Sequence, residues 1–146
     1  MSVGGGPGNL QQLSQEYEEL TEEVEELQRA VSELDEQIDG CEEAIEALEN
    51  MEDGSEILVP LGGETYVRAT VENVDEVIVG IGADVSAELE RDDAVESVEE
   101  KLDELEEMKE NVEEQVEEKQ ERLEQVAQKA QQAQAQAQAQ QRGERE

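Results

Sequence analysis

Histidine, phenylalanine and tryptophan are absent from this sequence of 146 residues, and the only aromatic side chains are two tyrosines. With neither histidine nor an activated nucleophile, we expect no catalytic site and no enzyme activity. Neither a phosphate-binding loop nor a metal-ligand motif occurs, so we expect no cofactor and no metal site. A single cysteine, Cys41, excludes an intramolecular disulfide and fits a reducing compartment.

Basic residues are scarce: 10 Lys and Arg stand against 43 Asp and Glu, and the net charge is −33. Binding to nucleic acid or to an anionic membrane is disfavoured, because both need clusters of basic side chains. Neither a membrane-spanning apolar run nor a signal peptide is present, so we expect a cytoplasmic protein. So many like charges repel one another across a small fold. Molar salt shortens the Debye length to about 3 Å and screens this repulsion. The charge therefore predicts a halophilic protein, although an acidic interaction protein would have a similar composition.

Apolar residues recur in alternating steps of three and four along the first third of the sequence, which is the pattern of a coiled coil. The positions between them are nearly all Glu, Gln or Asp. The first apolar seam predicts a helix over residues 10–50 and consists of Leu10, Leu13, Tyr17, Leu20, Val24, Leu27, Val31, Leu34, Ile38, Cys41, Ile45 and Leu48.

A second seam of twelve positions predicts a helix over residues 92–134. It consists of Val95, Val98, Leu102, Leu105, Lys109, Val112, Val116, Lys119, Leu123, Val126, Ala130 and Ala133. Antiparallel pairing of the two seams sets Leu48 opposite Val95 and Leu10 opposite Ala133. A parallel homodimer of the first helix is the alternative, since β-branched residues at a and Leu at d suit that state.

Besides Tyr17, three seam positions depart from the aliphatic pattern. We expect Lys109 and Lys119 to lay their stems over the seam and to reach neighbouring Glu side chains. We expect Cys41 to be buried and to pack as a small hydrophobic residue.

The 3.5-residue period disappears between the seams, and β-branched residues gather in short runs that predict up to four strands. Gly62–Gly63 predicts a two-residue hairpin turn, and Asn73–Asp75 separates the next two strands. Gly80 and Gly82 indicate a bulge or bend, and Pro60 places its strand at an edge or an interruption. Two hairpins of this size are marginal in isolation, so the strands need partner chains.

The predicted fold is mainly α with a small β insert: a long antiparallel coiled-coil hairpin with two β-hairpins between its helices. We expect one domain over residues 10–134, made of helix 10–50, β-hairpins 55–89 and helix 92–134. A flexible leader, 1–9, precedes it. An Ala/Gln-rich tail, 135–146, follows and is expected to be disordered, because its period of two gives a helix no buried stripe.

The segment EILVPLGGETYVRATVENVDEVIVGIGADVSAE, flanked by two coiled-coil helices, resembles the alpha subunits of archaeal prefoldins. The resemblance covers residues 10–134 and is most specific in the strand segment. It implies a hexamer with a prefoldin beta subunit, two alpha and four beta, whose strands form a double β-barrel carrying six coiled-coil arms. It also implies an ATP-independent chaperone that captures non-native polypeptides and transfers them to a group II chaperonin.

Two groups of residues are predicted to carry this function. At the open end of the arm, large side chains face small ones and leave apolar surface uncovered, which predicts client binding by Leu10, Leu13, Tyr17, Val126, Ala130 and Ala133. Subunit assembly is predicted to use the apolar strand residues Ile57, Leu58, Val59, Leu61, Tyr66, Val67, Val77, Ile78, Val79 and Ile81.

Two other functions fit parts of the sequence. An acidic module that masks basic proteins such as histones would account for the charge but not for the strands, and its binding would collapse in molar salt. A coiled-coil scaffold that forms a homodimer would need no beta subunit.

Overall fold

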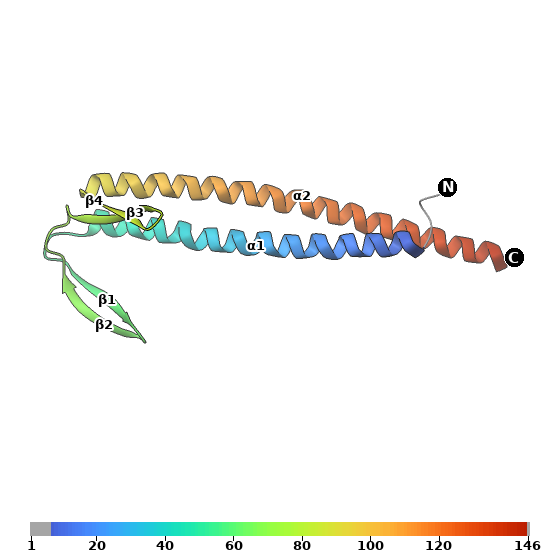
Figure 1. Ribbon diagram of the computed structural model, residues 1–146, viewed down its shortest axis with the longest axis horizontal. Coiled ribbons are helices and arrows are strands. Elements are labelled where there is room, and N and C mark those ends of the chain that lie inside the picture. Colours follow the sequence, from blue (N-terminus) through green and yellow to red (C-terminus); the bar gives the residue numbers. More distant parts are fainter. Residues whose placement is uncertain (1–6, 146) are drawn as a thin grey trace. The chain divides into compact units, whose positions relative to one another are not determined.

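The computed structural model describes residues 7–145, which form two long helices and, between them along the sequence, four strands (Figure 1). The elements follow in the order α1 Pro7–Asn50, β1 Glu56–Gly62, β2 Thr65–Thr70, β3 Val77–Gly82, β4 Val85–Leu89 and α2 Arg91–Arg145. This is the predicted coiled-coil hairpin with two β-hairpins inserted between its helices. Contacts divide the chain into two units, each of which includes part of both helices.

The first unit joins Met1–Glu33 to Met108–Glu146. Leu13 and Leu20 of α1 form a buried cluster with Val126 and Ala133 of α2. The partly buried side chains of Leu10, Leu123 and Ala130 pack against this cluster. The predicted antiparallel pairing is thus confirmed in this unit, because the N-terminal part of α1 packs against the C-terminal part of α2 that the pairing sets opposite it.

The second unit is Leu34–Glu107. Its helical core consists of Ile38, Cys41 and Leu105, with Leu34, Val98 and Leu102 packed against them. Cys41 is a free, buried thiol, as predicted. Ala94, in the first turn of α2, is fully buried. The second seam begins one residue later, at Val95, because a single alanine gives too weak a hydropathy signal to extend it.

The two hairpins are separate two-stranded antiparallel sheets, β1–β2 and β3–β4, and each has one register shift near the end of its first strand. In the first, the register shifts between Pro60 and Gly62, and in the second it shifts between Gly80 and Gly82. The bulge predicted at Gly80 and Gly82 is therefore confirmed. Because every strand has one unpaired edge, each hairpin offers backbone hydrogen-bonding groups to another chain.

The turn of the first hairpin lies one residue later than Gly62–Gly63. Gly62 pairs with Thr65, and the turn residues Gly63 and Glu64 both have positive φ, 56° and 60°. The bulge explains the difference, because it adds a residue to β1 and places Gly62 in the ladder with φ 101°. Positive φ at both turn residues matches the twist of the flanking strands.

Polar contacts fix the base of the first hairpin. The Gly54 amide donates to the Val71 carbonyl at 2.8 Å, and the Val71 amide donates to the Ser55 carbonyl at 2.9 Å. The Asp53 carboxylate accepts from the amide of Val74 at 2.9 Å. The loop that follows β2 is thus tied to the loop that precedes β1.

Helix α2 continues through the Ala/Gln-rich segment to Arg145, where the sequence predicts a fraying helix that becomes a disordered tail. Ala and Gln both have high helix propensity, so this segment can extend an existing helix without a buried stripe. In the predicted leader, Pro7 already begins α1, and residues 1–6 lie outside the described part. The division into leader, domain and tail stays a prediction. Along residues 7–145, no helix is apolar over a length sufficient to cross a membrane.

Candidate functional site

A groove of about 450 Å³ lies between α1 and α2 in the first unit. Its walls are apolar side chains and a few uncharged polar ones. It is lined by Leu10, Leu13, Ser14, Tyr17, Val126, Ala127, Ala130, Gln131 and Gln134.

Five of the six residues predicted to bind clients line this groove, and the sixth, Ala133, is buried in the cluster beside it. Their exposure differs widely: Val126 is 3% exposed and Leu13 8%, whereas Tyr17 is 46% exposed. The two buried side chains hold the helices together. Tyr17, with the partly buried Leu10, supplies the apolar surface that a ligand could reach.

Four lining residues were missed by the seam analysis: Ser14, Ala127, Gln131 and Gln134. They flank the seam, where the rest of the chain carries mostly Glu. That replacement of Glu by small or amide side chains beside a seam is the sequence signal that could have identified them.

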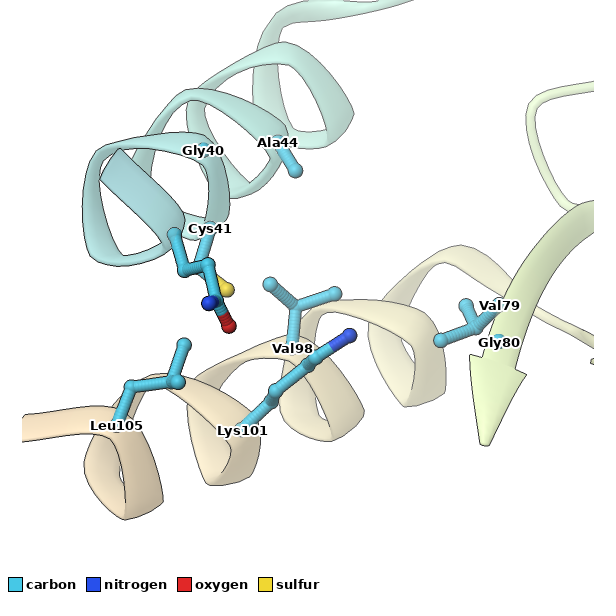
Figure 2. A pocket seen from close by; sticks show the side chains of 9 residues that line it. Gly40, Cys41, Ala44, Val79, Gly80, Val98, Lys101 and Leu105 are labelled. Carbon is cyan, nitrogen blue, oxygen red and sulfur yellow. The ribbon is translucent and has the colours of Figure 1, made fainter. Parts of the chain in front are cut away.

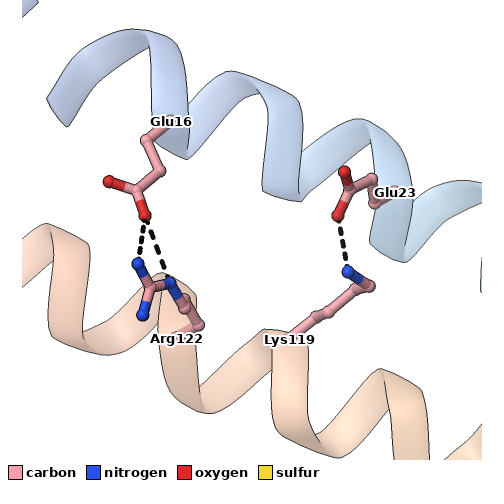
Figure 3. Close-up of polar contacts among 4 residues, drawn as sticks. All are labelled: Glu16, Glu23, Lys119 and Arg122. Carbon is pink, nitrogen blue, oxygen red and sulfur yellow. Dashed lines mark hydrogen bonds and ion pairs between the residues drawn. The ribbon is translucent and has the colours of Figure 1, made fainter. Parts of the chain in front are cut away.

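Two ion pairs link α1 to α2 in the same unit (Figure 3). The Arg122 guanidinium contacts the Glu16 carboxylate at 2.8 Å, and the Lys119 ammonium contacts Glu23 at 2.6 Å. The predicted reach of Lys119 to a neighbouring Glu is confirmed. Lys109 also contacts a neighbouring Glu, Glu113, at 3.7 Å.

The strands in the second unit expose several of the residues predicted to assemble subunits. A two-stranded sheet cannot cover both of its faces, so large apolar side chains remain in contact with solvent. Those more than two fifths exposed are Leu58, Leu61, Tyr66, Val67, Ile78 and Ile81. Ile57, Val59 and Val77 are half-buried.

Val79 differs from the other strand residues because the chain itself buries it, to 9% exposure. With Cys41, Val98 and Leu105 it lines a cavity of about 300 Å³ in the second unit (Figure 2). Val79 therefore packs β3 against the helices, and its role in subunit assembly stays a prediction.

The chemistry available at both places is apolar contact. Between residues 7 and 145, no group of three or more acidic or thiol side chains is arranged to hold a metal ion. The groove presents aliphatic side chains, one phenol and two amides, and the strands present aliphatic side chains beside unpaired backbone edges. These features suit the binding of apolar polypeptide segments.

Comparison with known proteins gives the family. The family model for prefoldin subunits matches residues 20–136, most of both helices and all four strands. The chain belongs to the prefoldin family. A prefoldin subunit alpha of Haloarcula marismortui is 49% identical to it over 92 residues, and one of Haloquadratum walsbyi is 52% identical over 101 residues. The resemblance to archaeal prefoldin alpha subunits is confirmed, as is the halophilic origin predicted from the charge.

The alignments cover only part of each relative. They span 63% of this prefoldin-family chain and 60% of the Haloarcula protein, and 69% of the chain and 66% of the Haloquadratum protein. The chain therefore matches less than two thirds of either relative's length.

A solved structure shares the fold. It is the cryo-EM structure of filamentous PFD from Methanocaldococcus jannaschii, with a TM-score of 0.50 and 25% sequence identity. The match covers 80% of this prefoldin-family chain and 93% of that one. The predicted fold class is confirmed by this match and by the order of helices and hairpins.

Proposed function

We propose that this chain is a subunit of an ATP-independent chaperone that captures non-native polypeptides in the groove of the first unit. The observation that carries the proposal is the groove itself, about 450 Å³ and lined by apolar side chains with Tyr17 46% exposed. Membership of the prefoldin family supports the same activity. The captured polypeptide is then transferred to a group II chaperonin in the cytoplasm.

Capture of this kind needs many weak contacts and no cofactor. Burial of one large apolar side chain contributes roughly 1.5–3 kcal/mol. A client segment that covers Tyr17 and Leu10 of one arm gains little more binding free energy than this, so it dissociates readily from a single arm. Several arms that hold one unfolded chain raise the overall affinity because each later contact is intramolecular.

The exposed strand residues support assembly through the hairpins. Ile78 is 76% exposed and Leu61 65% exposed, on sheets whose strands each have an unpaired edge. Apolar residues so exposed beside open edges are a hazard for aggregation unless other strands cover them. We propose that four prefoldin beta subunits and a second copy of this chain provide those strands, in a hexamer of two alpha and four beta.

Substitution of Tyr17 and Leu10 by Ser tests the groove. Leu13 is left unchanged, because its burial means that a serine there would weaken the helix pair itself. We expect the double variant to lose at least half of its ability to suppress aggregation of a chemically unfolded reporter protein in molar KCl. Met108→Ser is the matched control, since Met108 is 53% exposed in the same unit but does not line the groove.

Equal suppression by the double variant and by the Met108 control would contradict the assignment of the groove. Circular dichroism of both variants shows that the helices are intact. The native mass of each assembly must also be unchanged, so that lost capture is not lost assembly.

A further inference from the structure

The acidic charge of the chain is absent from most of the segments that form the groove; of the lining residues, Tyr17 lies between Glu16 and Glu18. Every Asp and Glu lies between Glu16 and Glu124 except for Glu144 and Glu146. Residues 1–15 contain no charged side chain, and residues 125–143 contain only Lys129 and Arg142, both exposed. In a chain of net charge −33, the segments that form most of the groove are thus neutral to slightly positive, and Tyr17 is the lining residue that lies within the acidic part.

The lining of the groove follows the same distribution. None of its nine residues is charged, whereas a surface pocket farther along α1 in the same unit is lined by Glu25 and Arg29 with two uncharged residues. Glu16 is the first carboxylate after the neutral segment of α1. Its Oε1 atom accepts hydrogen bonds from Arg122 at 2.8 and 3.1 Å, so its charge is compensated in place.

Helix formation does not explain the change from Glu to Gln. The two residues have nearly equal helix propensity, and exposed positions elsewhere on α1 and α2 are mostly Glu. The segment 125–143 keeps the helix but replaces the carboxylate with an amide, a side chain of the same shape without the charge. The property that changes along the helix is therefore the electrostatic potential.

The two segments without acidic side chains are long compared with the distance over which the acidic charges next to them act. At about 1.5 Å per residue, Pro7–Gln15 spans about 13 Å of α1, and residues 125–143 span about 28 Å of α2. The Debye length is about 3 Å in molar salt and about 8 Å at physiological ionic strength. In molar salt, a ligand in the outer part of the groove is screened from the acidic remainder of the chain and meets only uncharged side chains and Lys129.

From this we infer that the groove accepts a particular class of client: apolar segments of acidic polypeptides, whose Asp and Glu side chains would be repelled by the rest of the chain. This inference rests on the proposed function. Leu10 and Tyr17 take the client's apolar side chains, while Gln131 and Gln134 can donate hydrogen bonds to its carboxylates. Lys129, beside Ala130, adds a local positive charge.

Two fluorescent peptides test the inference with the full-length chain in the assembly that it forms. Both carry the same Leu and Val residues, but their polar positions are all Glu in one and all Gln in the other. In two-molar KCl we expect the Glu peptide to bind the unsubstituted chain at least as tightly as the Gln peptide.

Negative charge placed in the groove should weaken its binding of the Glu peptide. In half-molar KCl, Gln131→Glu with Gln134→Glu should weaken binding of the Glu peptide by about three-fold or more and change binding of the Gln peptide less than about two-fold. The matched control, Gln115→Glu with Gln120→Glu, adds the same charge to the acidic part of α2 and should change neither.

The outcomes separate the two proposals. If the unsubstituted chain binds the Gln peptide but binds the Glu peptide about ten-fold more weakly in two-molar KCl, the inference is wrong and the groove still binds polypeptide. Equal effects of the groove variant and its control would also overturn the inference. If neither peptide binds, the proposed function fails and the inference fails with it.

Discussion

Glu16 of α1 and Arg122 of α2 are joined by two hydrogen bonds to a single carboxylate oxygen, one from Nε at 3.1 Å and one from Nη2 at 2.8 Å. Glu23 and Lys119 make a second link at 2.6 Å. Both links tie α1 to α2 beside the apolar seam, where a shift of either helix would break them. In a chain with so few basic residues, two of them are thus used to fix the helix register next to the groove.

Removal of the first link should cost little stability. Arg122 is 59% exposed and Glu16 36% exposed, and pairs of this kind contribute about 0.2–1 kcal/mol. A double-mutant cycle with Arg122→Gln and Glu16→Gln should give a coupling energy in that range from urea unfolding. The coupling should decrease as KCl is raised, and a value that does not change with salt would contradict an exposed ion pair.

Cys41 should tolerate a larger side chain. It borders the cavity of about 300 Å³, and the neighbouring seam positions Leu34 and Leu48 already hold leucine. Filling part of the cavity with Cys41→Leu should raise the free energy of unfolding by about 1 kcal/mol, while Cys41→Ala should lower it by about the same amount. Thermal unfolding compares the two variants. Equal destabilisation by both would show that the cavity cannot accept the added methyl groups.

Gly40 and Gly62 should respond in opposite ways to alanine. Gly40 lies inside α1, with no atom within 4 Å of an added Cβ, so Gly40→Ala should raise the free energy of unfolding by about 1 kcal/mol. Gly62 has equal space but φ 101°, so Gly62→Ala should lower stability by about 1–2 kcal/mol. Urea unfolding of both variants measures the difference, and a stabilising Gly62→Ala would contradict the bulge conformation at that residue.

Substitutions at two adjacent residues of β3 should distinguish effects on assembly from effects on folding. Ile78 is 76% exposed and Val79 is 9% exposed. Ile78→Glu should leave the helical circular dichroism unchanged and reduce the mass of the assembly, because it places a charge only where a partner strand would lie. Val79→Glu should reduce helicity and stability, since it buries a carboxylate against the helices. An Ile78 variant that assembles normally would exclude this face of β3 from the subunit interface.

The helices and much of the groove could be predicted because they depend on a periodic pattern. The seam through Leu13, Leu20 and Val126 repeats strictly enough to give both the helices and their antiparallel pairing. The strands could be predicted from a different signal, the short runs of β-branched residues between the seams. Ala94 was missed because one small residue outside a seam has no periodic signal, although it is fully buried.

Local backbone detail and side-chain exposure could not be predicted from patterns in the sequence. The bulge before Gly62 moves the turn by one residue, and a Gly-Gly pair is compatible with either position. Tyr17 and Leu13 are consecutive positions of one seam, yet Tyr17 is exposed and Leu13 is buried, because exposure depends on the residues across the groove. Val79 was grouped with the assembly residues, since alternation along a strand does not tell which face its own helices cover.

The native mass of the assembly isolated in molar KCl, with its components identified, tests the central claim most directly. The account predicts two copies of this chain with four copies of a smaller coiled-coil subunit. A homodimer of this chain alone would contradict the account and favour a coiled-coil scaffold. Basic partners that are lost as salt is added would contradict it as well, and would favour an acidic protein that masks positive charge.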